Sequence, residues 1–439
     1  MTTFDKILPA AAEVLTAEAD LVAQLDWLVI NRDLNGRVRF IVPESIEAND
    51  ALRAKIEALY QALTERIAAH AYPVATGILF EANVDDACAG GARFPLEAFD
   101  KVWIADRLAT EGNWAQIAPE TQGAPRVVFF SIKGGVGRST ALAACAWKLA
   151  QLGKRVLVLD LDLESPGLSS SLLPPERQPL YGITDWLVED LIDQGDALLE
   201  AMIATSDLSR DGQIYAVPAH GADPGEYIAK LGRVWMPKVH SDGRRESWSM
   251  RLQRLLQRLE ARIQPDIVLI DSRAGIDEVA SSCVTDLGAN LILLFALDGS
   301  QTWNGYEILF KHWLRSSVAT QIRERLQTVA ALVPELDPTA YLADLREHAY
   351  DLFLETLYDE VSATDDEGWS FDLASEIAPH QPWSVRWHRG FAALRTLHGR
   401  LAQIDDEEVR HVFGDLIGRT LRSLGWAEGY PKVIDGGTF

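Results

Sequence analysis

The chain is 439 residues long and acidic, with 41 lysines and arginines against 64 aspartates and glutamates and a formal net charge of -23. This balance argues against attraction of the whole protein to DNA, RNA or anionic lipid. The three cysteines have no C-x-x-C spacing, which excludes a disulfide framework and a cysteine-based zinc site and favours a reducing, bacterial-type cytoplasm. No apolar run approaches the ~20 residues of a membrane-spanning helix, which excludes a membrane span.

Residues 1–125 have the pattern of a small α+β domain. A hairpin-like turn signal stands at Asp33–Gly36, and apolar residues at helical spacing predict a helix from Asn49 or Asp50 to about His70. Strands are predicted at Trp27–Asn31, Arg37–Val42, Gly77–Glu81 and Val102–Ala105. We expect a ferredoxin-like accessory domain that binds a protein partner, followed by a linker at Ala118–Pro125.

Residues 126–430 follow a different pattern, in which buried strands alternate with helices. Because such strands are typical of a parallel sheet covered on both faces, we predict an α/β domain with a mostly parallel sheet and a helical C-terminal part. An exposed loop at Ala363–Gly368 and a tail at 431–439 complete the chain. The predicted elements are strands at Arg126–Ile132, Val156–Leu159, Ile267–Ile270 and Leu291–Ala296, a helix at Thr140–Leu152 and further helices after Pro338.

The most informative stretch is Val127–Thr140, which reads Val-Val-Phe-Phe-Ser-Ile-Lys-Gly-Gly-Val-Gly-Arg-Ser-Thr. A buried strand leads into glycines and then into a helix. Glycines let backbone N–H groups approach phosphate oxygens without a Cβ in the way, and the helix N-terminus adds its dipole. Ser139 lies where a hydroxyl would be a ligand of Mg²⁺. The stretch therefore predicts a phosphate-binding loop.

This stretch resembles the deviant Walker A motif of the ParA/MinD family of P-loop ATPases, K-G-G-x-x-G-K-[ST]-[ST]. Lys133 matches the signature lysine, which in that family reaches across a homodimer interface to the nucleotide of the facing subunit. Arg138 replaces the second lysine, keeping its charge on a longer, planar head group. Three outcomes stay open: ATP is bound and slowly hydrolysed, bound without turnover, or not bound. The resemblance implies an ATP and Mg²⁺ site with the nucleotide-binding residues Lys133, Gly134, Gly135, Val136, Gly137, Arg138, Ser139 and Thr140.

Two further motifs stand at the spacing of the same family. Asp160 and Asp162 follow a strand as D-x-D, and the resemblance places Asp160 near Mg²⁺ and its waters. Asp271 matches the Walker B acid that holds Mg²⁺ through water. Arg273 replaces a proline of the family pattern; as a hypothesis it lies near the γ-phosphate, and a surface arginine is the alternative. The implied catalytic residues are Asp162, which positions the attacking water, with Lys133 and Arg138, and the implied metal-binding residues are Ser139, Asp160 and Asp271.

Weaker similarities extend the resemblance to about Ala427. The segment Gln213–His220 resembles a family strand that would place Lys230 near the dimer interface. The segment Ile377–Val385, which contains Pro379, resembles the family segment that lies by the adenine.

The base of the nucleotide is less well defined by the sequence than its phosphates. Pro334 and Glu335 stand where the resemblance leads us to expect an adenine-reading asparagine. We interpret the tryptophans Trp303, Trp313, Trp383 and Trp387 as packing residues rather than as residues that stack on a base.

Two alternatives of function accompany this interpretation. A dinucleotide-binding Rossmann protein would explain Asp160 as a ribose-binding acid, but it leaves Lys133, Ser139 and Asp271 without a role. A DNA-partitioning ATPase would use the arginines on one face of the predicted helix Trp248–Ile263, although the net charge of -23 favours a solvated face.

The sequence as a whole predicts an ATP-dependent dimerisation switch. We expect it to hydrolyse ATP slowly and to control association with an unknown protein partner through residues 1–125, in a bacterial regulatory or defence-type system. A nucleotide-binding pseudo-ATPase scaffold without turnover is the alternative.

Overall fold

The computed structural model describes residues 2–108, 112–209, 211–360, 368–391 and 397–426. The chain divides into two compact units, residues 1–116 with 312–318 and residues 117–311 with 319–439. The loop predicted at 363–368, apart from Gly368, and the tail predicted at 431–439 lie outside the described residues. In the described part of the chain, none of the helices combines the length and the apolar composition that a membrane crossing requires.

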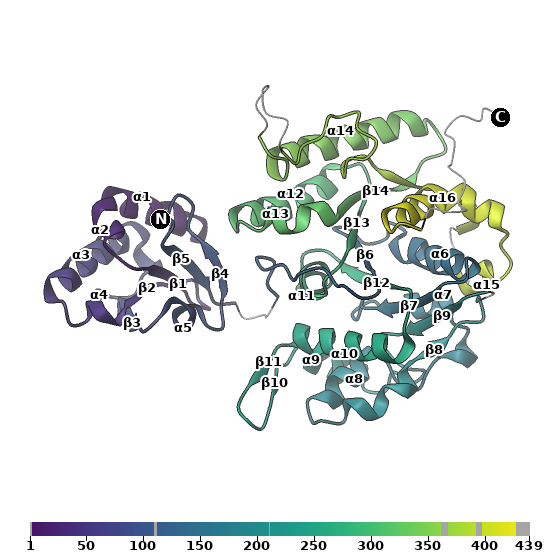
Figure 1. The fold of residues 1–439 in the computed structure, drawn as a ribbon, viewed down its shortest axis with the longest axis horizontal. Helices are drawn as coiled ribbons and strands as arrows, with labels where there is room; N and C mark the ends of the chain where they lie inside the picture. The colour runs from purple at the N-terminus through teal and green to yellow at the C-terminus, as the bar shows by residue number, and fades with distance from the viewer. Residues whose placement is uncertain (1, 109–111, 210, 361–367, 392–396, 427–439) are drawn as a thin grey trace. The chain divides into compact units, whose positions relative to one another are not determined.

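The first unit is built on a mixed five-stranded sheet in the order β3-β2-β1-β5-β4 (Figure 1). β1 and β2 form the predicted antiparallel hairpin, and the N–H of Gly36 donates to the carbonyl of Asp33 at 2.9 Å. The ferredoxin-like prediction is wrong, because a helix separates the first two strands in that fold, whereas here they form a hairpin. The strands are β1 Leu28–Arg32, β2 Val38–Pro43, β3 Ile78–Glu81, β4 Ala92–Pro95 and β5 Val102–Asp106.

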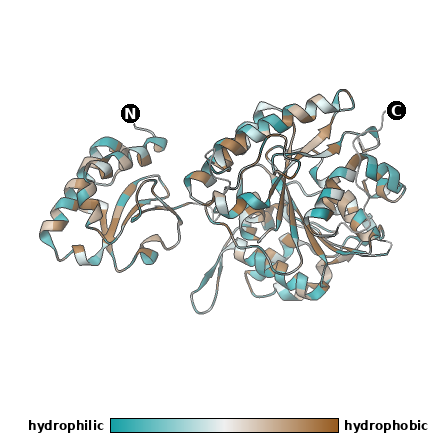
Figure 2. Ribbon diagram, turned by 45° about the horizontal axis from the view of Figure 1, so that its top comes forward, coloured by the Kyte–Doolittle hydropathy of each residue, from teal (hydrophilic) through white to brown (hydrophobic). Residues whose placement is uncertain are grey.

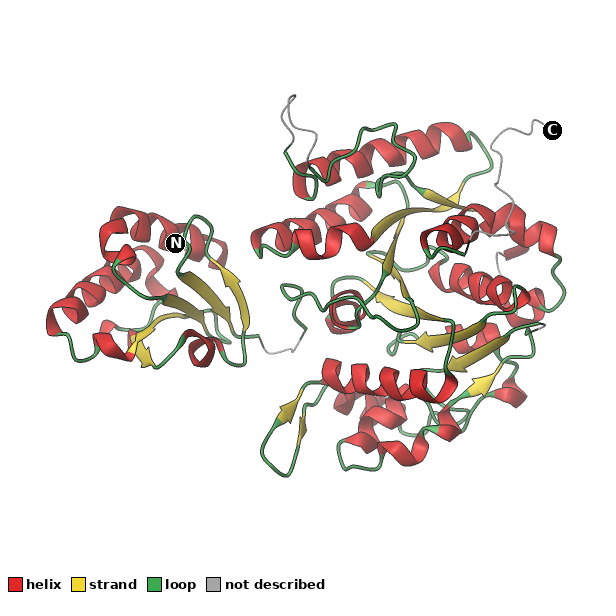
Figure 3. Cartoon of the chain, viewed as in Figure 1, coloured by secondary structure: helices red, strands yellow, loops and turns green. Residues whose placement is uncertain are grey.

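Helices cover both faces of this sheet (Figure 3). On one face, α1 and α3 share an apolar cluster with Phe40 and other sheet residues. On the other face, Val29 and Ile41 belong to a smaller cluster with Cys88 of α5. Asn49 caps α3, as predicted, by accepting a hydrogen bond from the N–H of Leu52 at 3.1 Å. The helices are α1 Ile7–Ala17, α2 Ala19–Ala23, α3 Asp50–Ile67, α4 Val74–Gly77 and α5 Val84–Cys88.

The second unit contains an eight-stranded sheet in the order β15-β14-β13-β6-β12-β7-β9-β8. Every neighbouring pair is parallel except β8 with β9 at one edge. The central strands are apolar along their length (Figure 2), which confirms the predicted parallel sheet. The strands are β6 Arg126–Ser131, β7 Arg155–Asp160, β8 Ala204–Thr205, β9 Gln213–Val217, β12 Ile267–Ala274, β13 Leu291–Ala296, β14 Leu326–Val333 and β15 Trp383–Arg386, with a separate hairpin of β10 Lys238–Val239 and β11 Arg245–Glu246.

Helices lie on both faces of the large sheet, as predicted. α6 and α16 bury apolar residues on one face, in a cluster that includes Val127 and Phe129 of β6. On the opposite face, the ring centroid of Phe130 lies 6.1 Å from that of Tyr306 in α12. The helices are α6 Arg138–Gln151, α7 Leu168–Leu172, α8 Ile183–Asp190, α9 Tyr227–Val234, α10 Trp248–Ile263, α11 Glu278–Ser281, α12 Ser300–Arg315, α13 Ala319–Ile322, α14 Pro338–Thr356, α15 Leu397–Leu401 and α16 Asp406–Ser423.

The segment predicted as a linker is part of the second unit. The N–H groups of Ala118 and Thr121 donate to the carbonyls of Thr285 and Gly288 at 2.8 and 2.9 Å. The backbone polar groups of this stretch therefore have partners in the sheet domain, and the linker prediction is corrected. The glycine and prolines that suggested a flexible connection are compatible with a packed, irregular segment.

The arginines of α10 are paired with acids of the same unit. Arg251 is fully buried, and its Nε donates to Oδ2 of Asp190 at 2.9 Å. Each arginine of this face therefore has a carboxylate beside it. The other pairs are Arg254 with Asp190 and Glu246, Arg258 with Asp196, and Arg262 with Glu200.

Candidate functional site

The predicted phosphate-binding loop joins β6 to α6. The strand ends at Ser131, and Gly137 is the N-cap residue of α6. Gly135 and Gly137 have φ angles of 76° and 79°, in the left-handed region that favours glycine. Among the described residues no side chain caps this helix, so its first N–H groups stay available to an anion.

The side chain of Arg138 turns inward from the loop, and only 7% of it is exposed. Its Nε donates to Oδ1 of Asp271 at 2.8 Å, its Nη1 to Oγ of Ser131 at 3.0 Å, and its Nη2 to Oδ2 of Asp162 at 3.3 Å. Burial lowers the pKa of the guanidinium, but the two carboxylates outweigh burial and the pKa of Arg138 is raised. The arginine is therefore a permanent cation between two acids.

The acids lie at the carboxyl ends of β7 and β12, which are neighbours in the sheet. Asp160 and Asp271 pair in register, and each is 1% exposed. Burial, together with the carboxylate of Asp271, raises the pKa of Asp160 to about 7. Burial also raises the pKa of Asp162, although Arg138 offsets part of this effect. Strand order thus brings together acids that are far apart in the sequence.

Asp160 also has a local structural contact. Its Oδ2 accepts hydrogen bonds of 3.0–3.4 Å from three successive backbone N–H groups at the start of α7. Its Oδ1 is buried and has no hydrogen-bond partner among the described residues, and the same holds for Oδ1 of Asp162. One oxygen of each acid is therefore left with unused hydrogen-bonding capacity among the described residues.

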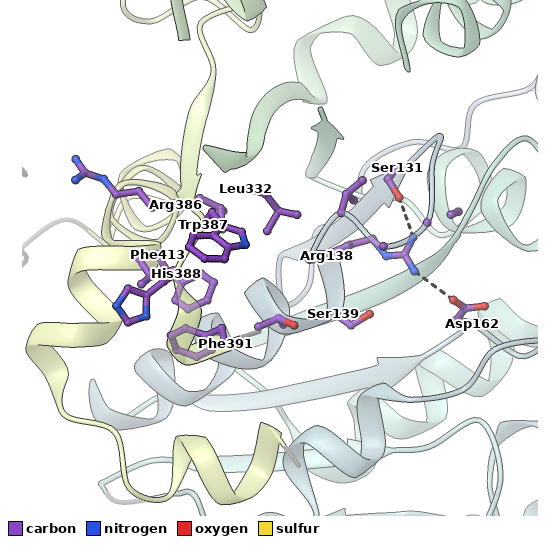
Figure 4. A pocket seen from close by; sticks show the side chains of 18 of the residues that line it. Ser131, Arg138, Ser139, Asp162, Leu332, Arg386, Trp387, His388, Phe391 and Phe413 are labelled. Atoms are coloured by element: carbon purple, nitrogen blue, oxygen red, sulfur yellow. Dashed lines mark hydrogen bonds and ion pairs between the residues drawn. The ribbon is translucent and has the colours of Figure 1, made fainter. Parts of the chain in front are cut away.

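A cavity of about 750 Å³ opens at this edge of the sheet (Figure 4). Its volume lies in the range of small-molecule sites, roughly 300–1,000 Å³. All of the predicted nucleotide-binding residues except Lys133 line it. Asp162 and Arg273 line it as well, whereas Asp160 and Asp271 do not. Lys133 is exposed on the loop outside the cavity.

The other end of the cavity was predicted from the sequence only in part, since Val385, the last residue of the segment expected by the adenine, lines it. It is lined by residues of β14, β15 and α16 and of the turn after β15. Trp387, which the sequence suggests packs in the core or at an interface, is 42% exposed and lines the cavity, so core packing is wrong for it and interface packing stays a prediction. Trp313 and Trp383 are buried, as predicted. The lining residues at this end are Leu332, Val385, Arg386, Trp387, His388, Phe391, Val412 and Phe413.

Pro379 does not line the cavity. Its carbonyl accepts a hydrogen bond from the N–H of Thr328 at 2.9 Å, which places it beside the first half of β14. Because parallel strands carry their ligands at the carboxyl ends, the residues after β15 reach the cavity and Pro379, which precedes β15, does not. Val385, the last residue of the segment expected by the adenine, does line the cavity, so the place of this segment near a base stays a prediction.

Two further predicted residues have ion-pair partners within the unit. Arg273 lines the cavity, and its Nη2 lies 2.6 Å from Oε2 of Glu164. Lys230 lies on α9, outside the cavity, with its Nζ 2.6 Å from Oδ1 of Asp185. The role of Arg273 near a phosphate and the place of Lys230 at a dimer interface stay predictions.

A parallel sheet, a glycine loop at the start of a helix and acids at the neighbouring strand ends define a P-loop nucleotide-binding protein. The family model described as "CobQ/CobB/MinD/ParA nucleotide binding domain" matches residues 127–351, about half of the chain. The chain belongs to this family, and the resemblance to ParA/MinD-like P-loop ATPases is confirmed.

Individual relatives match parts of the chain. The putative arsenical pump-driving ATPase 1 of Aquifex aeolicus is 47% identical over 53 residues, 12% of this chain and 13% of that protein. The septum site-determining protein MinD of Buchnera aphidicola (subsp. Acyrthosiphon pisum) is 26% identical over 178 residues, 40% of this chain and 52% of that protein. The chain thus spans about half or less of the length of these curated relatives.

Solved structures of low sequence identity cover about 70% of this chain. MinD from Pyrococcus horikoshii complexed with Mg-ADP has a TM-score of 0.40 and 17% identity, covering 70% of this chain and 99% of that chain. The ParA of pNOB8 bound to nonspecific DNA has a TM-score of 0.43 and 17% identity, covering 69% of this chain and 98% of that chain.

Proposed function

We propose that this protein is an ATP-binding switch that hydrolyses ATP slowly, pairs with a second copy when nucleotide is bound, and controls association with a protein partner. The observation that carries the proposal is the cavity, in which the loop before α6 lies at one end and a cluster of rings at the other. In such a switch, nucleotide binding and hydrolysis shift the population of an associated state.

The loop end of the cavity supports binding of the phosphates. Ser139 and Thr140, in the first turn of α6, line it, and no described side chain caps the N–H groups of this turn. On this proposal, Arg138 exchanges its carboxylate partners for phosphate oxygens, because a guanidinium forms bidentate hydrogen bonds with both groups.

Mg²⁺ fits the oxygen donors on this side of the cavity. The hydroxyl of Ser139 lines the cavity, and the buried Oδ1 of Asp160 has no hydrogen-bond partner among the described residues. Mg²⁺ prefers such oxygens and usually retains several waters. Ser139, Asp160 and Asp271 would hold the ion, which supplies positive charge to the phosphates.

Hydrolysis would depend on three side chains of this family pattern. Asp162 lines the cavity and would orient the attacking water, while Arg138 and the Lys133 of a second copy would stabilise charge on the phosphates. One observation favours the pseudo-ATPase alternative: Arg138 bonds to both Asp162 and Asp271, and an arginine that stayed there would leave neither acid free.

The remaining parts of the proposal concern partners. Lys133 is exposed on the loop, as a residue that reaches a second copy would be. The first unit has its own apolar core and is our candidate for recognising a protein partner in a bacterial regulatory or defence-type system. DNA partitioning is less favoured because the arginines of α10 are paired. Three buried, unpaired cysteines support a cytoplasmic location.

Calorimetry with ATP, light scattering with and without ATP, and phosphate release test this proposal together. We expect ATP binding, a doubled mass with ATP and slow phosphate release. Gly137→Val is the matched negative control, because Gly137 has a φ of 79° and a Cβ there would lie 3.2 Å from Leu332. Binding and dimerisation without phosphate release would favour the pseudo-ATPase, and absence of ATP binding would refute the proposal.

A further inference from the structure

The end of the cavity away from the loop is a wall of rings. The centroids of Phe391 and Phe413 lie 5.0 Å apart at an interplanar angle of 84°, and those of His388 and Phe391 lie 6.2 Å apart. Together with Trp387, these side chains surround one side of the cavity in Figure 4. Such a surface matches a flat aromatic ligand better than a phosphate.

Leu332 connects the two ends of the cavity. It has a φ of 50°, which is strained for a leucine, and it lies where the pairing of β14 with β15 shifts register. A Cβ added to Gly137 would lie 3.2 Å from its Cδ2, so its side chain packs closely on the loop. In Figure 4 it stands between Trp387 and Arg138. The ring wall is thereby held at a defined place relative to the phosphate loop.

Trp387 combines a fixed backbone with an accessible ring. Its N–H donates to the carbonyl of Val333 at 2.9 Å, which continues the pairing of β15 with β14. Yet 42% of the residue is exposed, in contrast to Trp383 four positions earlier, which is 7% exposed. An indole that is accessible on a cavity wall exposes apolar surface to water, and a ligand that stacked on it would gain free energy by covering that surface.

We infer that Trp387 is the stacking platform for the base of the nucleotide and that the site discriminates weakly between bases. This inference rests on the proposed function, and adds to it the way in which the base is held. At this end of the cavity the described lining residues that carry polar side-chain groups are Arg386, His388 and, through its indole N–H, Trp387 itself. The backbone N–H of Gly390 donates a hydrogen bond of 3.2 Å to Nδ1 of His388, so this ring nitrogen already has a partner.

Weak discrimination follows from the chemistry of this wall. Reading adenine takes a paired donor and acceptor, as an asparagine or glutamine amide provides, and reading guanine takes donors such as those of an arginine. The arginine at this end, Arg386, is exposed, and in Figure 4 its guanidinium points away from Trp387 and Leu332. Stacking tolerates any base because each has a π-face, and it contributes about 1–3 kcal/mol per base. Purines, with the larger rings, should bind better than pyrimidines, and ATP and GTP should bind almost equally.

Calorimetric titration of the full chain with ATP, GTP, CTP and inorganic tripolyphosphate, each with Mg²⁺, tests the inference. We expect Trp387→Ala to weaken ATP and GTP binding about tenfold or more, in line with the energy of stacking, and to leave tripolyphosphate unchanged. Trp387→Phe keeps a ring and should restore most of the affinity. Tyr181→Ala is the matched control, because Tyr181 is 41% exposed and lies outside the cavity lining.

The outcomes separate this inference from the proposed function. If ATP and tripolyphosphate both bind but Trp387→Ala changes neither, the stacking platform is wrong and the phosphate site stands. If wild-type protein prefers ATP over GTP by about a hundredfold or more, the base is read by hydrogen bonds and weak discrimination is wrong. If neither ATP nor tripolyphosphate binds, the proposed function and this inference both fail.

Discussion

Replacing Arg138 by methionine tests whether the arginine neutralises the carboxylates beside it. Methionine fills a similar length but removes the bonds to Asp271 and Asp162. Asp271 is 1% exposed, so its charge would be left without a partner in a dry environment. Removing one member of a buried ion pair costs about 3–5 kcal/mol, and we expect the free energy of unfolding to fall by that amount.

Arg138→Lys is the matched variant that keeps the charge. An ammonium is a compact donor and cannot bridge both carboxylates and Ser131 as the planar guanidinium does. We expect it to lose about 1–2 kcal/mol, roughly one charge-assisted hydrogen bond. The assay is urea unfolding of the full chain at pH 8, followed by circular dichroism, with and without ATP. ATP should raise the stability of wild-type protein by mass action and that of Arg138→Met much less.

A double-mutant cycle with Asp271→Asn decides whether the effect arises from this contact. Because Arg138 and Asp271 are bonded at 2.8 Å, the two substitutions should be non-additive, with a coupling energy of about 1–3 kcal/mol. Additivity within about 0.5 kcal/mol, or an Arg138→Met variant as stable as wild type, would refute the reasoning.

Three further predictions follow from other contacts. Lys133→Ala should leave ATP binding intact but abolish the ATP-dependent dimer, and a doubled mass that persists in light scattering with ATP would contradict the role of Lys133 in the dimer. Asp190→Asn should lower the free energy of unfolding by about 3–5 kcal/mol at pH 7, since Arg251 is fully buried against Asp190, and an unchanged urea midpoint would argue against this. Burial opposes the ion pairs, yet the pKa of Asp190 is lowered to about 2. The stabilisation is therefore present above about pH 4 and is lost as the pH falls towards 2. Burial raises the pKa of Asp286 to about 6, so this carboxyl contributes stability that is present below about pH 4 and lost as the pH rises through 6. Asp286→Asn keeps the hydrogen bond from Thr285 and should be more stable than wild type by about 1–3 kcal/mol at pH 8. Equal stabilities of the two proteins at pH 8 would be the contrary result.

Much of the second unit was predictable because its signals are local. The strand, the glycine loop and the start of α6 follow one another within Val127–Thr140, and each depends on neighbouring residues alone. Asp160 and Asp162 were identified because they stand at and just after the end of β7, and Asp271 because it follows the apolar run that begins β12. Their proximity could be expected from the rule that carboxyl ends of parallel strands share an edge.

The ring wall illustrates what local signals could not reveal. Trp387 reads as one of 13 tryptophans, most naturally packed, until β15 is known to be the edge strand beside β14. Phe413 comes from α16, and it meets Phe391 only through the packing of that helix on the sheet. A signal was present in Trp387 and His388, the two aromatic residues directly after β15, but the strand order was needed to interpret it.

By itself, the sequence determined the class of this protein: an acidic chain with a P-loop, strand-end acids and a parallel sheet, each encoded by short-range periodicity and spacing. The tertiary structure alone decided which groups meet. It placed the guanidinium of Arg138 between Asp271 and Asp162, attached residues 118–121 to the sheet domain, and aligned the rings opposite the loop. Those contacts join residues more than a hundred positions apart in several cases, and burial and strand order, rather than local propensity, select them.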